Sequence, residues 1–264
     1  MIFAAGLGTR LKPLTDTLPK ALVPVGGRPL IEHVCRKLMC SGIDSALVNV
    51  HHFADDVQAW IDSQDWICTE ENLLKEGRML VQTSDERKML LETGGAVLNA
   101  RRYLEGCGMF LVHNVDILSD LDIRWFASQV KDGAVATLLV SGRKSSRQLL
   151  FDPQTMMLKG WHNLSTGEIR SPYRNLDPSG CLSFAFSGIH IMSDRILGLL
   201  ETYAREQGLY DNSQMPRFSI IDFYLWACAG YGIQGVFADN LRLIDVGKLD
   251  TLALAEEFIL TQNV

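Results

Sequence analysis

The chain has 264 residues, of which 47% are hydrophobic and 21% charged, and its formal net charge at pH 7 is −6. This composition is that of a globular protein with enough apolar side chains for a sizeable core. The negative net charge and the lack of a long basic run argue against a nucleic-acid partner. No segment approaches the roughly twenty apolar residues that span a bilayer, and the amino terminus lacks the basic region of a signal peptide. We therefore expect a cytoplasmic protein with no membrane partner.

Strands and helices alternate along the first half of the chain, which predicts an α/β fold with a doubly wound, mainly parallel sheet. The expected strands are 1–5, 46–50, 79–83, 109–112 and 135–140. The expected helices are 26–42, 53–63, 94–104 and 123–131. His51 and His52 follow the second strand without a Glu-x-x-His partner, which favours a structural pair over a metal site.

The pattern changes near Ser141. Asp152-Pro153 joins two short apolar runs, 149–151 and 157–161, and this predicts a β-hairpin as a small antiparallel extension. The elements expected after it are a turn-rich loop at 166–180, strands at 182–192, 233–237 and 241–246, and helices at 195–206, 220–229 and 249–260. No repeat or flexible linker interrupts the chain, so we expect one domain over residues 1–264. Six scattered cysteines without a Cys-x-x-Cys pair are typical of buried thiols in a reducing compartment.

A glycine-rich stretch after the first expected strand carries the clearest functional signal. Gly6-Leu7-Gly8 lets the backbone approach a ligand and leaves N–H groups for phosphate, while Arg10 and Lys20 add two cations. A dinucleotide-binding oxidoreductase would need a glycine where Leu11 stands, and no P-loop Gly-Lys-Ser/Thr run occurs. An isolated Gly-x-Gly is also an ordinary turn between a strand and a loop.

The longer string resembles a family signature. Residues 6–15 and 19–25 fill Gly-x-Gly-Thr-Arg-Leu-x-Pro-Leu-Thr and Pro-Lys-x-Leu-x-Pro-Val, the signature of the sugar-1-phosphate nucleotidyltransferases. The resemblance implies a Rossmann-like nucleotidyltransferase fold and an enzyme of nucleotide-sugar biosynthesis. Such an enzyme joins a nucleoside triphosphate to a sugar 1-phosphate and releases pyrophosphate, with Mg²⁺ as its cofactor. The resemblance also implies a nucleotide-binding part at 1–140 and a sugar-phosphate-binding part at 141–264.

The same resemblance assigns roles to individual residues. Asp116 and Asp245 match the family's metal ligands, and Arg10, Lys20 and Asp116 match its catalytic residues. The positions that match its nucleotide-binding residues are Ala5, Gly6, Gly8, Thr9, Glu92, Thr93, Gly94 and Gly95. Thr93 can cap the helix that follows, and the two glycines leave its amides open to a ligand. Gly188 matches the strand that lines the sugar pocket.

Two aspartates decide the metal prediction. Asp116 follows a buried strand, where open α/β sheets hold ligands, and Asp245 precedes a Val-Gly pair. Either aspartate alone could merely cap the next helix or turn. Val115 stands where the family has glycine and Lys248 where it has threonine, so both change the surroundings of the expected metal.

The substrate prediction rests on weaker signals. Leu-Glu-Thr-Gly-Gly at 91–95 resembles the uridylyltransferases more than the guanylyltransferases. The compact outline resembles both the uridylyltransferases acting on N-acetylmuramate 1-phosphate and the short mannose- or heptose-1-phosphate guanylyltransferases. We therefore expect UTP, with GTP and mannose- or heptose-1-phosphate as the alternative. A basic loop of Arg143, Lys144 and Arg147 either meets the sugar phosphate or is simply solvated. A non-catalytic regulatory subunit is a further alternative, which the retained cations and aspartates disfavour.

Overall fold

The computed structural model describes residues 1–71, 74–210 and 215–261. Its backbone contacts fall into two compact units. Unit 1 consists of Met1–Leu90, His113–Arg124 and Arg242–Val264, and unit 2 consists of Leu91–Val112 and Trp125–Leu241. The units interleave along the sequence and do not coincide with 1–140 and 141–264. The division of the chain by function therefore remains a prediction.

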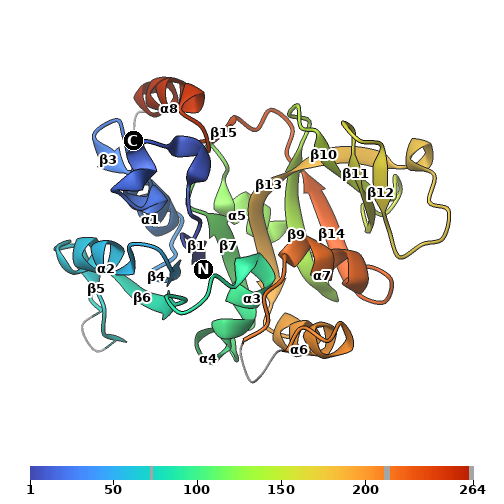
Figure 1. The fold of residues 1–264 in the computed structure, drawn as a ribbon, viewed down its shortest axis with the longest axis horizontal. Helices are drawn as coiled ribbons and strands as arrows, with labels where there is room; N and C mark the ends of the chain where they lie inside the picture. The colour runs from blue at the N-terminus through green and yellow to red at the C-terminus, as the bar shows by residue number, and fades with distance from the viewer. Residues whose placement is uncertain (72–73, 211–214, 262–264) are drawn as a thin grey trace. The chain divides into compact units, whose positions relative to one another are not determined.

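Unit 1 is built on parallel strands. Their order is β7, β1, β4, β6 and β5, and all neighbouring pairs run parallel (Figure 1). The bounds are β1 Ile2–Phe3, β4 Ser45–Val50, β5 Ile67–Cys68, β6 Met79–Asp85 and β7 Met109–Asn114, of which His113 and Asn114 belong to unit 1. All of β4 after Ser45 is buried, as expected of a parallel strand covered on both faces. The predicted α/β class and mainly parallel sheet are confirmed, although β5 was not predicted.

Two antiparallel pairs complete unit 1. β2 (Pro24–Val25) and β3 (Arg28–Pro29) form a hairpin through Gly26 and Gly27, both of which have positive φ angles. The expected helix over 26–42 is therefore wrong at its start, because α1 (Leu30–Cys40) begins only after the hairpin. β8 (Ile117–Ser119) pairs with β15 (Leu243–Asp245). The remaining helices of unit 1 are α2 (Ala54–Asp62) and α8 (Asp250–Thr261).

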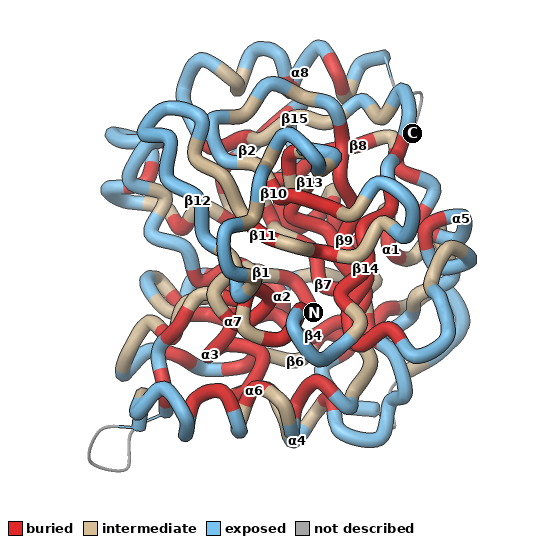
Figure 2. Tube along the Cα trace, turned by 90° about the vertical axis from the view of Figure 1, so that its right-hand side faces the viewer, coloured by how far each residue is buried: buried red, intermediate tan, exposed pale blue. Residues whose placement is uncertain are grey.

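Unit 2 is centred on β9 (Ala134–Ser141), in which every residue is buried (Figure 2). β14 (Gly232–Phe237) runs parallel to β9, while β13 (Leu182–Ser193) runs antiparallel to it. The sheet continues from β13 through β10 (Arg147–Phe151), β11 (Leu158–Asn163) and β12 (Glu168–Arg170). The predicted hairpin is confirmed as β10 and β11, but β12 lies within the stretch expected to be only a loop.

Helices pack against one another beside this sheet. They are α3 (Glu92–Asn99), α4 (Arg101–Leu104), α6 (Ile196–Glu206) and α7 (Ile220–Ala227), while α5 (Ile123–Ser128) starts in unit 1. Tyr203 of α6 meets Phe218, Phe223 and Trp226, with ring centroids 5.2–5.8 Å apart. These aromatic contacts bury large apolar areas and fix the approach of α7 to α6.

The cysteines follow the prediction only in part. Cys35, Cys68 and Cys228 are buried, whereas Cys40 and Cys107 are exposed, and all six cysteines are free thiols. Burial raises the pKa of the Cys35 thiol to about 12, which keeps it protonated and unreactive. Across the described residues, no helix combines the length and the apolar character needed to cross a bilayer.

Candidate functional site

An ion pair between Lys20 and Asp116 occupies the carboxyl-terminal end of the unit 1 sheet. Lys20 lies in a short 3₁₀ turn (Lys20–Leu22), and Asp116 lies between β7 and β8. The Lys20 ammonium donates to Oδ2 of Asp116, and the side chains are only 11% and 17% exposed. The structure thus brings together two residues that are 96 positions apart and that the sequence assigned to catalysis. Removing one partner of an ion pair this shielded from water destabilises the fold much more than removing one partner of a solvated pair, because the remaining charge is left buried and unpaired.

Asp245 lies at the neighbouring position of the β8–β15 ladder. It is opposite Ile117, and the amide of Val246 donates to the carbonyl of Asp116 at 2.8 Å. Oδ1 of Asp245 is buried, and no group among the described residues forms a hydrogen bond with it. A buried carboxylate oxygen without a partner is costly unless a ligand satisfies it.

Gly247 allows a close approach at the same place. A Cβ atom there would lie 2.5 Å from Oδ1 of Asp245 and 2.8 Å from Nη2 of Arg10. Any other residue would therefore displace the carboxylate or the guanidinium. Arg10, Lys20, Asp116 and Asp245 accordingly form one cluster of charges within unit 1.

This donor set fits Mg²⁺. Asp116 and Asp245 supply two carboxylates, and no group of three or more His, Cys, Asp or Glu side chains that could hold a metal occurs within residues 1–71, 74–210 and 215–261. Mg²⁺ is commonly held by one or two carboxylates together with water and substrate phosphates rather than by a cage of protein ligands. Oδ1 of Asp245, which bonds to nothing in the described part of the chain, is the atom that such an ion would satisfy.

The glycine-rich loop is exposed beside the cluster. Gly6, Thr9 and Arg10 are exposed, while Gly8 adopts a left-handed φ of +61° and its carbonyl accepts from the buried Thr15 hydroxyl at 2.8 Å. The amide of Ala5 donates to Oδ1 of Asn49 at 3.3 Å. Ala5 therefore does not offer its N–H to a ligand, and its assignment to nucleotide binding rests on its other backbone atoms.

In unit 2, the stretch 91–95 is bound to the segment 216–220. The amides of Gly94 and Gly95 both donate to the carbonyl of Phe218, at 2.9 and 3.3 Å. The Thr93 hydroxyl accepts from the amide of Ile220 and does not cap its own helix, which begins one residue earlier, at Glu92. The expectation of open amides capped by Thr93 is therefore wrong, because the distant segment uses these groups.

Glu92 has an unusual backbone conformation in the same stretch. Its φ is +59°, a left-handed value that costs a residue with a side chain about 1 kcal/mol or more. Its carboxylate pairs with Arg217 at 3.0 Å, so the segment 216–220 also holds the side chain. Whether residues 92–95 bind a nucleotide remains a prediction.

In unit 2, Arg143 contacts the strand that contains Gly188. This glycine lies in β13 where the register with β9 shifts between Phe186 and His190. Nη2 of Arg143 donates to the carbonyl of Phe186 at 2.9 Å, and Nε of Arg143 is buried without a partner among the described residues. Arg143 is thus directed toward the expected sugar-binding strand, whereas Lys144 and Arg147 are exposed.

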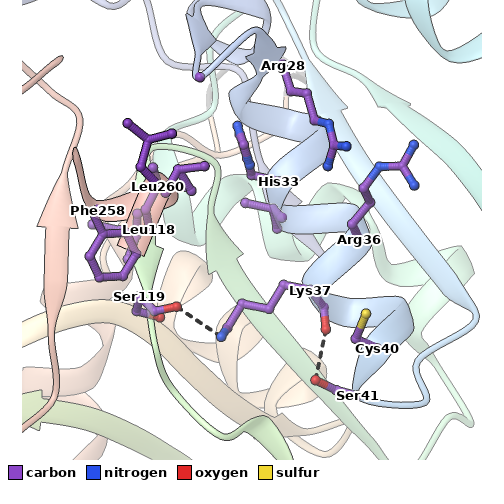
Figure 3. Close-up of a pocket in the computed structure, with 14 residues that line it drawn as sticks. Arg28, His33, Arg36, Lys37, Cys40, Ser41, Leu118, Ser119, Phe258 and Leu260 are labelled. Atoms are coloured by element: carbon purple, nitrogen blue, oxygen red, sulfur yellow. Dashed lines mark hydrogen bonds between the residues drawn. The ribbon is translucent and has the colours of Figure 1, made fainter. Parts of the chain in front are cut away.

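A cavity of about 540 Å³ opens next to β8 (Figure 3). Its lining comes from α1, β8 and α8 and includes Lys37, whose ammonium donates to the carbonyl of Ser119 at 3.0 Å. Burial lowers the pKa of Lys37. His113, at the end of β7, is fully buried, and burial lowers its pKa to about 4, with the nearby Lys37 charge acting in the same direction.

The His51-His52 pair follows the structural interpretation. Nδ1 of His51 donates to the carbonyl of Glu86 at 2.7 Å. The sequence reasoning missed Asn49, Glu86 and the segment 216–220. An asparagine inside the apolar run Ala-Leu-Val-Asn-Val was the signal available for the first of them.

The sequence profile of the nucleotidyl transferase family matches residues 1–149. The chain belongs to this family. An N-acetylmuramate alpha-1-phosphate uridylyltransferase of Caulobacter vibrioides is 42% identical over 116 residues, which are 44% of this chain and 44% of that relative. A mannose-1-phosphate guanyltransferase of Aspergillus fumigatus is 29% identical over 142 residues, which are 53% of this chain and 36% of that relative. The chain thus spans less than half the length of either curated relative.

Solved structures resemble this chain over nearly its whole length. HddC from Yersinia pseudotuberculosis, complexed with GMP-PN, covers 98% of this chain and 97% of its own with a TM-score of 0.68 and 21% sequence identity. At that identity the similarity shows the fold alone. The family match includes Arg10, Lys20 and Asp116 but ends before Gly188 and Asp245.

Proposed function

We propose that this chain transfers a nucleotidyl group from a nucleoside triphosphate to a sugar 1-phosphate. The observation that carries the proposal is the charge cluster of unit 1. There Lys20 pairs with Asp116, and Arg10 lies with the unpartnered Oδ1 of Asp245 around Gly247. Such a cluster suits two reacting anions, because their charges must be screened before they can approach each other.

In the proposed reaction, a phosphate oxygen of the sugar 1-phosphate attacks the α-phosphorus of the triphosphate. A new P–O bond forms, the bond from the α-phosphorus to the bridging oxygen breaks, and pyrophosphate leaves with that electron pair. The attacking phosphate is already ionised at neutral pH, so the protein needs to orient and screen charge rather than to move a proton.

The residues of the charge cluster take separate roles in this proposal. Arg10, in the exposed loop, binds the triphosphate, and Lys20 holds the phosphates at the reacting centre. Asp116 and Asp245 would hold Mg²⁺, which neutralises developing charge on the phosphate oxygens when it is bound. Gly188 is proposed to receive the sugar phosphate, together with Arg143, which donates to the carbonyl of Phe186 on the same strand of unit 2.

UTP is the proposed nucleotide. The stretch Leu-Glu-Thr-Gly-Gly favours it, and so does the 42% identity to a uridylyltransferase. The alternative is a guanylyltransferase acting on mannose- or heptose-1-phosphate, which the guanyltransferase relative and the GMP-PN complex of the structural neighbour favour.

The test is pyrophosphate release, measured over UTP, GTP, CTP and dTTP crossed with N-acetylmuramate, glucose, mannose and heptose 1-phosphates, with and without Mg²⁺. We expect Mg²⁺-dependent release with UTP and one preferred sugar phosphate. A preference for GTP with every sugar phosphate would replace the uridylyl assignment by the alternative. No release with any pair, from protein shown to be folded, would refute nucleotidyl transfer.

A further inference from the structure

A buried hydrogen-bond chain links the ends of three strands of unit 1. Oδ1 of Asn49, on β4, accepts from the amides of Ala4 and Ala5 at 2.7 and 3.3 Å. Nδ2 of Asn49 donates to Oε1 of Glu86 at 2.8 Å. Ala4 and Ala5 follow β1, and Glu86 follows β6, so the chain joins the carboxyl-terminal ends of β1, β4 and β6.

Chemistry fixes the direction of every bond in this chain. The two backbone amides can only donate, so the Asn49 amide must turn its oxygen to them and its nitrogen to Glu86. Glu86 must then present an acceptor oxygen. Asn49 is 4% exposed and Glu86 2% exposed, so water offers neither side chain a replacement partner.

Further bonds hold Glu86 in place. Its amide donates to the carbonyl of Val50 at 2.7 Å, and its carbonyl accepts from Nδ1 of His51. Since β4 and β6 are in parallel register up to Val50 and Asp85, Glu86 is anchored directly beyond that ladder. The ladder therefore supplies a rigid support, and Asn49 transmits its position to the backbone that enters the Gly6-Leu7-Gly8 loop.

We propose that Asn49 and Glu86 are positioning residues for nucleotide binding, which act by holding the Ala4–Ala5 backbone where the glycine-rich loop receives the triphosphate. The inference rests on the proposed function only in that this loop binds the nucleotide. Neither residue needs to touch the substrate. An asparagine is required because an aspartate could accept from the amides but could not donate to Glu86, and a leucine would leave both amides unpaired.

The test removes the donor from the hydrogen bond between Asn49 and Glu86. Asn49→Asp places two carboxylates at hydrogen-bond distance in a buried place, where like charges repel. We expect the Kd of the preferred triphosphate, measured by calorimetry without sugar phosphate, to rise about 10- to 100-fold at pH 8. It should recover partly at pH 6, since a proton shared by the two carboxylates restores a donor. The KM for the sugar 1-phosphate should stay within about twofold.

The double variant Asn49→Asp/Glu86→Gln restores the bond, with the Gln amide donating to the Asp carboxylate. Its Kd for the triphosphate should return to within about threefold of the wild-type value. Gln58→Glu is the matched control: Gln58 likewise accepts from Thr83 and donates to the carboxylate of Asp62, but it lies on α2. This variant should bind the triphosphate like the wild type.

The outcomes separate the two claims. If the wild type binds neither UTP nor GTP, the proposed function fails before the variants are compared. If the wild type binds and Asn49→Asp binds equally well, or if the double variant does not recover, the positioning role is overturned. If Asn49→Asp does not fold, the double variant decides, because it must fold and bind for the inference to stand. An equal rise in the sugar phosphate KM would indicate a general structural role and would also overturn it.

Discussion

The buried imidazole of His113 makes stability depend on pH in a defined direction. Nδ1 of His113 donates to the carbonyl of Asn114 at 2.8 Å, and Nε2 is buried without a partner in the described part of the chain. Burial lowers the pKa to about 4, from 6.5 for an exposed histidine. The folded protein therefore binds this proton less readily than the unfolded chain does. His113 therefore does not reduce the free energy of unfolding above pH 6.5, and it reduces this free energy progressively as the pH drops from 6.5 toward 4.

The magnitude follows from the two pKa values. Between pH 7.5 and pH 5, the linkage relation gives a loss of about 2 kcal/mol from His113 alone. With a urea m-value of about 2–3 kcal/mol/M, the unfolding midpoint should fall by about 0.7–1 M. His113→Asn keeps a donor near the position of Nδ1 but cannot titrate. Between pH 7.5 and pH 5, its urea midpoint should therefore fall by about 0.7–1 M less than that of the wild type.

Urea unfolding of the wild type and of His113→Asn at both pH values checks this prediction, since the comparison cancels all other titrating groups. Equal losses of stability in the wild type and in His113→Asn would refute the reasoning.

Three predictions concern the charge cluster. Asp116→Asn and Asp245→Asn should each lower turnover at saturating Mg²⁺ by at least ~10², and near-normal turnover would remove the metal assignment. Arg10→Ala should weaken triphosphate binding yet melt within a few degrees of the wild type, because Arg10 is exposed. Lys20→Ala should weaken triphosphate binding and also lower the Tm, because it leaves Asp116 without its ion-pair partner. Gly247→Ala should weaken activation by Mg²⁺ about tenfold in a metal titration of turnover, because its Cβ displaces the Asp245 carboxylate or the Arg10 guanidinium; an unchanged titration would contradict this.

The long elements were predictable from the sequence, whereas several of the shortest strands were not. α1, β4 and β13 have enough residues for a repeating apolar pattern to appear. β2, β3 and β5 have two residues each, which is too few for any period to be recognised. β5 forms only because it pairs with β6, and β2 and β3 form only as partners of each other across the Gly26-Gly27 turn.

The candidate site shows the same limit. Lys20 was singled out because it lies in the signature string, and Asp116 because it follows a buried strand and matches a metal-binding aspartate of the family. The structure places the two side chains in one ion pair. Asn49 offers only the signal of a polar residue inside an apolar run, and Glu86 offers none, since their hydrogen bonds depend on which strand ends become neighbours. The stretch 91–95 was misinterpreted for a related reason: its amides are used by Phe218, which is more than 120 residues away. Local sequence shows which groups a turn can offer, but only the fold shows which groups are already bonded.

The glycines of this stretch are fixed by close backbone packing. A Cβ atom on Gly95 would lie 2.2 Å from the carbonyl oxygen of Pro216 and 3.1 Å from Cβ of Leu91. The Phe218 amide also donates to the carbonyl of Leu91 at 3.2 Å, so backbone bonds run in both directions between the two segments. Because the obstructing atom belongs to the backbone, a larger residue cannot be accommodated by turning a side chain.

Gly95→Ala must therefore push the segment 216–218 away and weaken the bonds that Phe218 makes. Overpacking costs about 1–3 kcal/mol and a weakened hydrogen bond about 1 kcal/mol more, so we expect a loss of about 2–4 kcal/mol and a Tm lower by about 5–10 °C. Gly198→Ala on α6 is the matched control, since a Cβ there meets no atom within 4 Å and alanine favours a helix by about 0.5–1 kcal/mol. Thermal melts should thus move in opposite directions for the same chemical change. If Gly95→Ala melts with the wild type, the 216–218 segment can shift at little cost, and its contacts do not hold the stretch 91–95 in place.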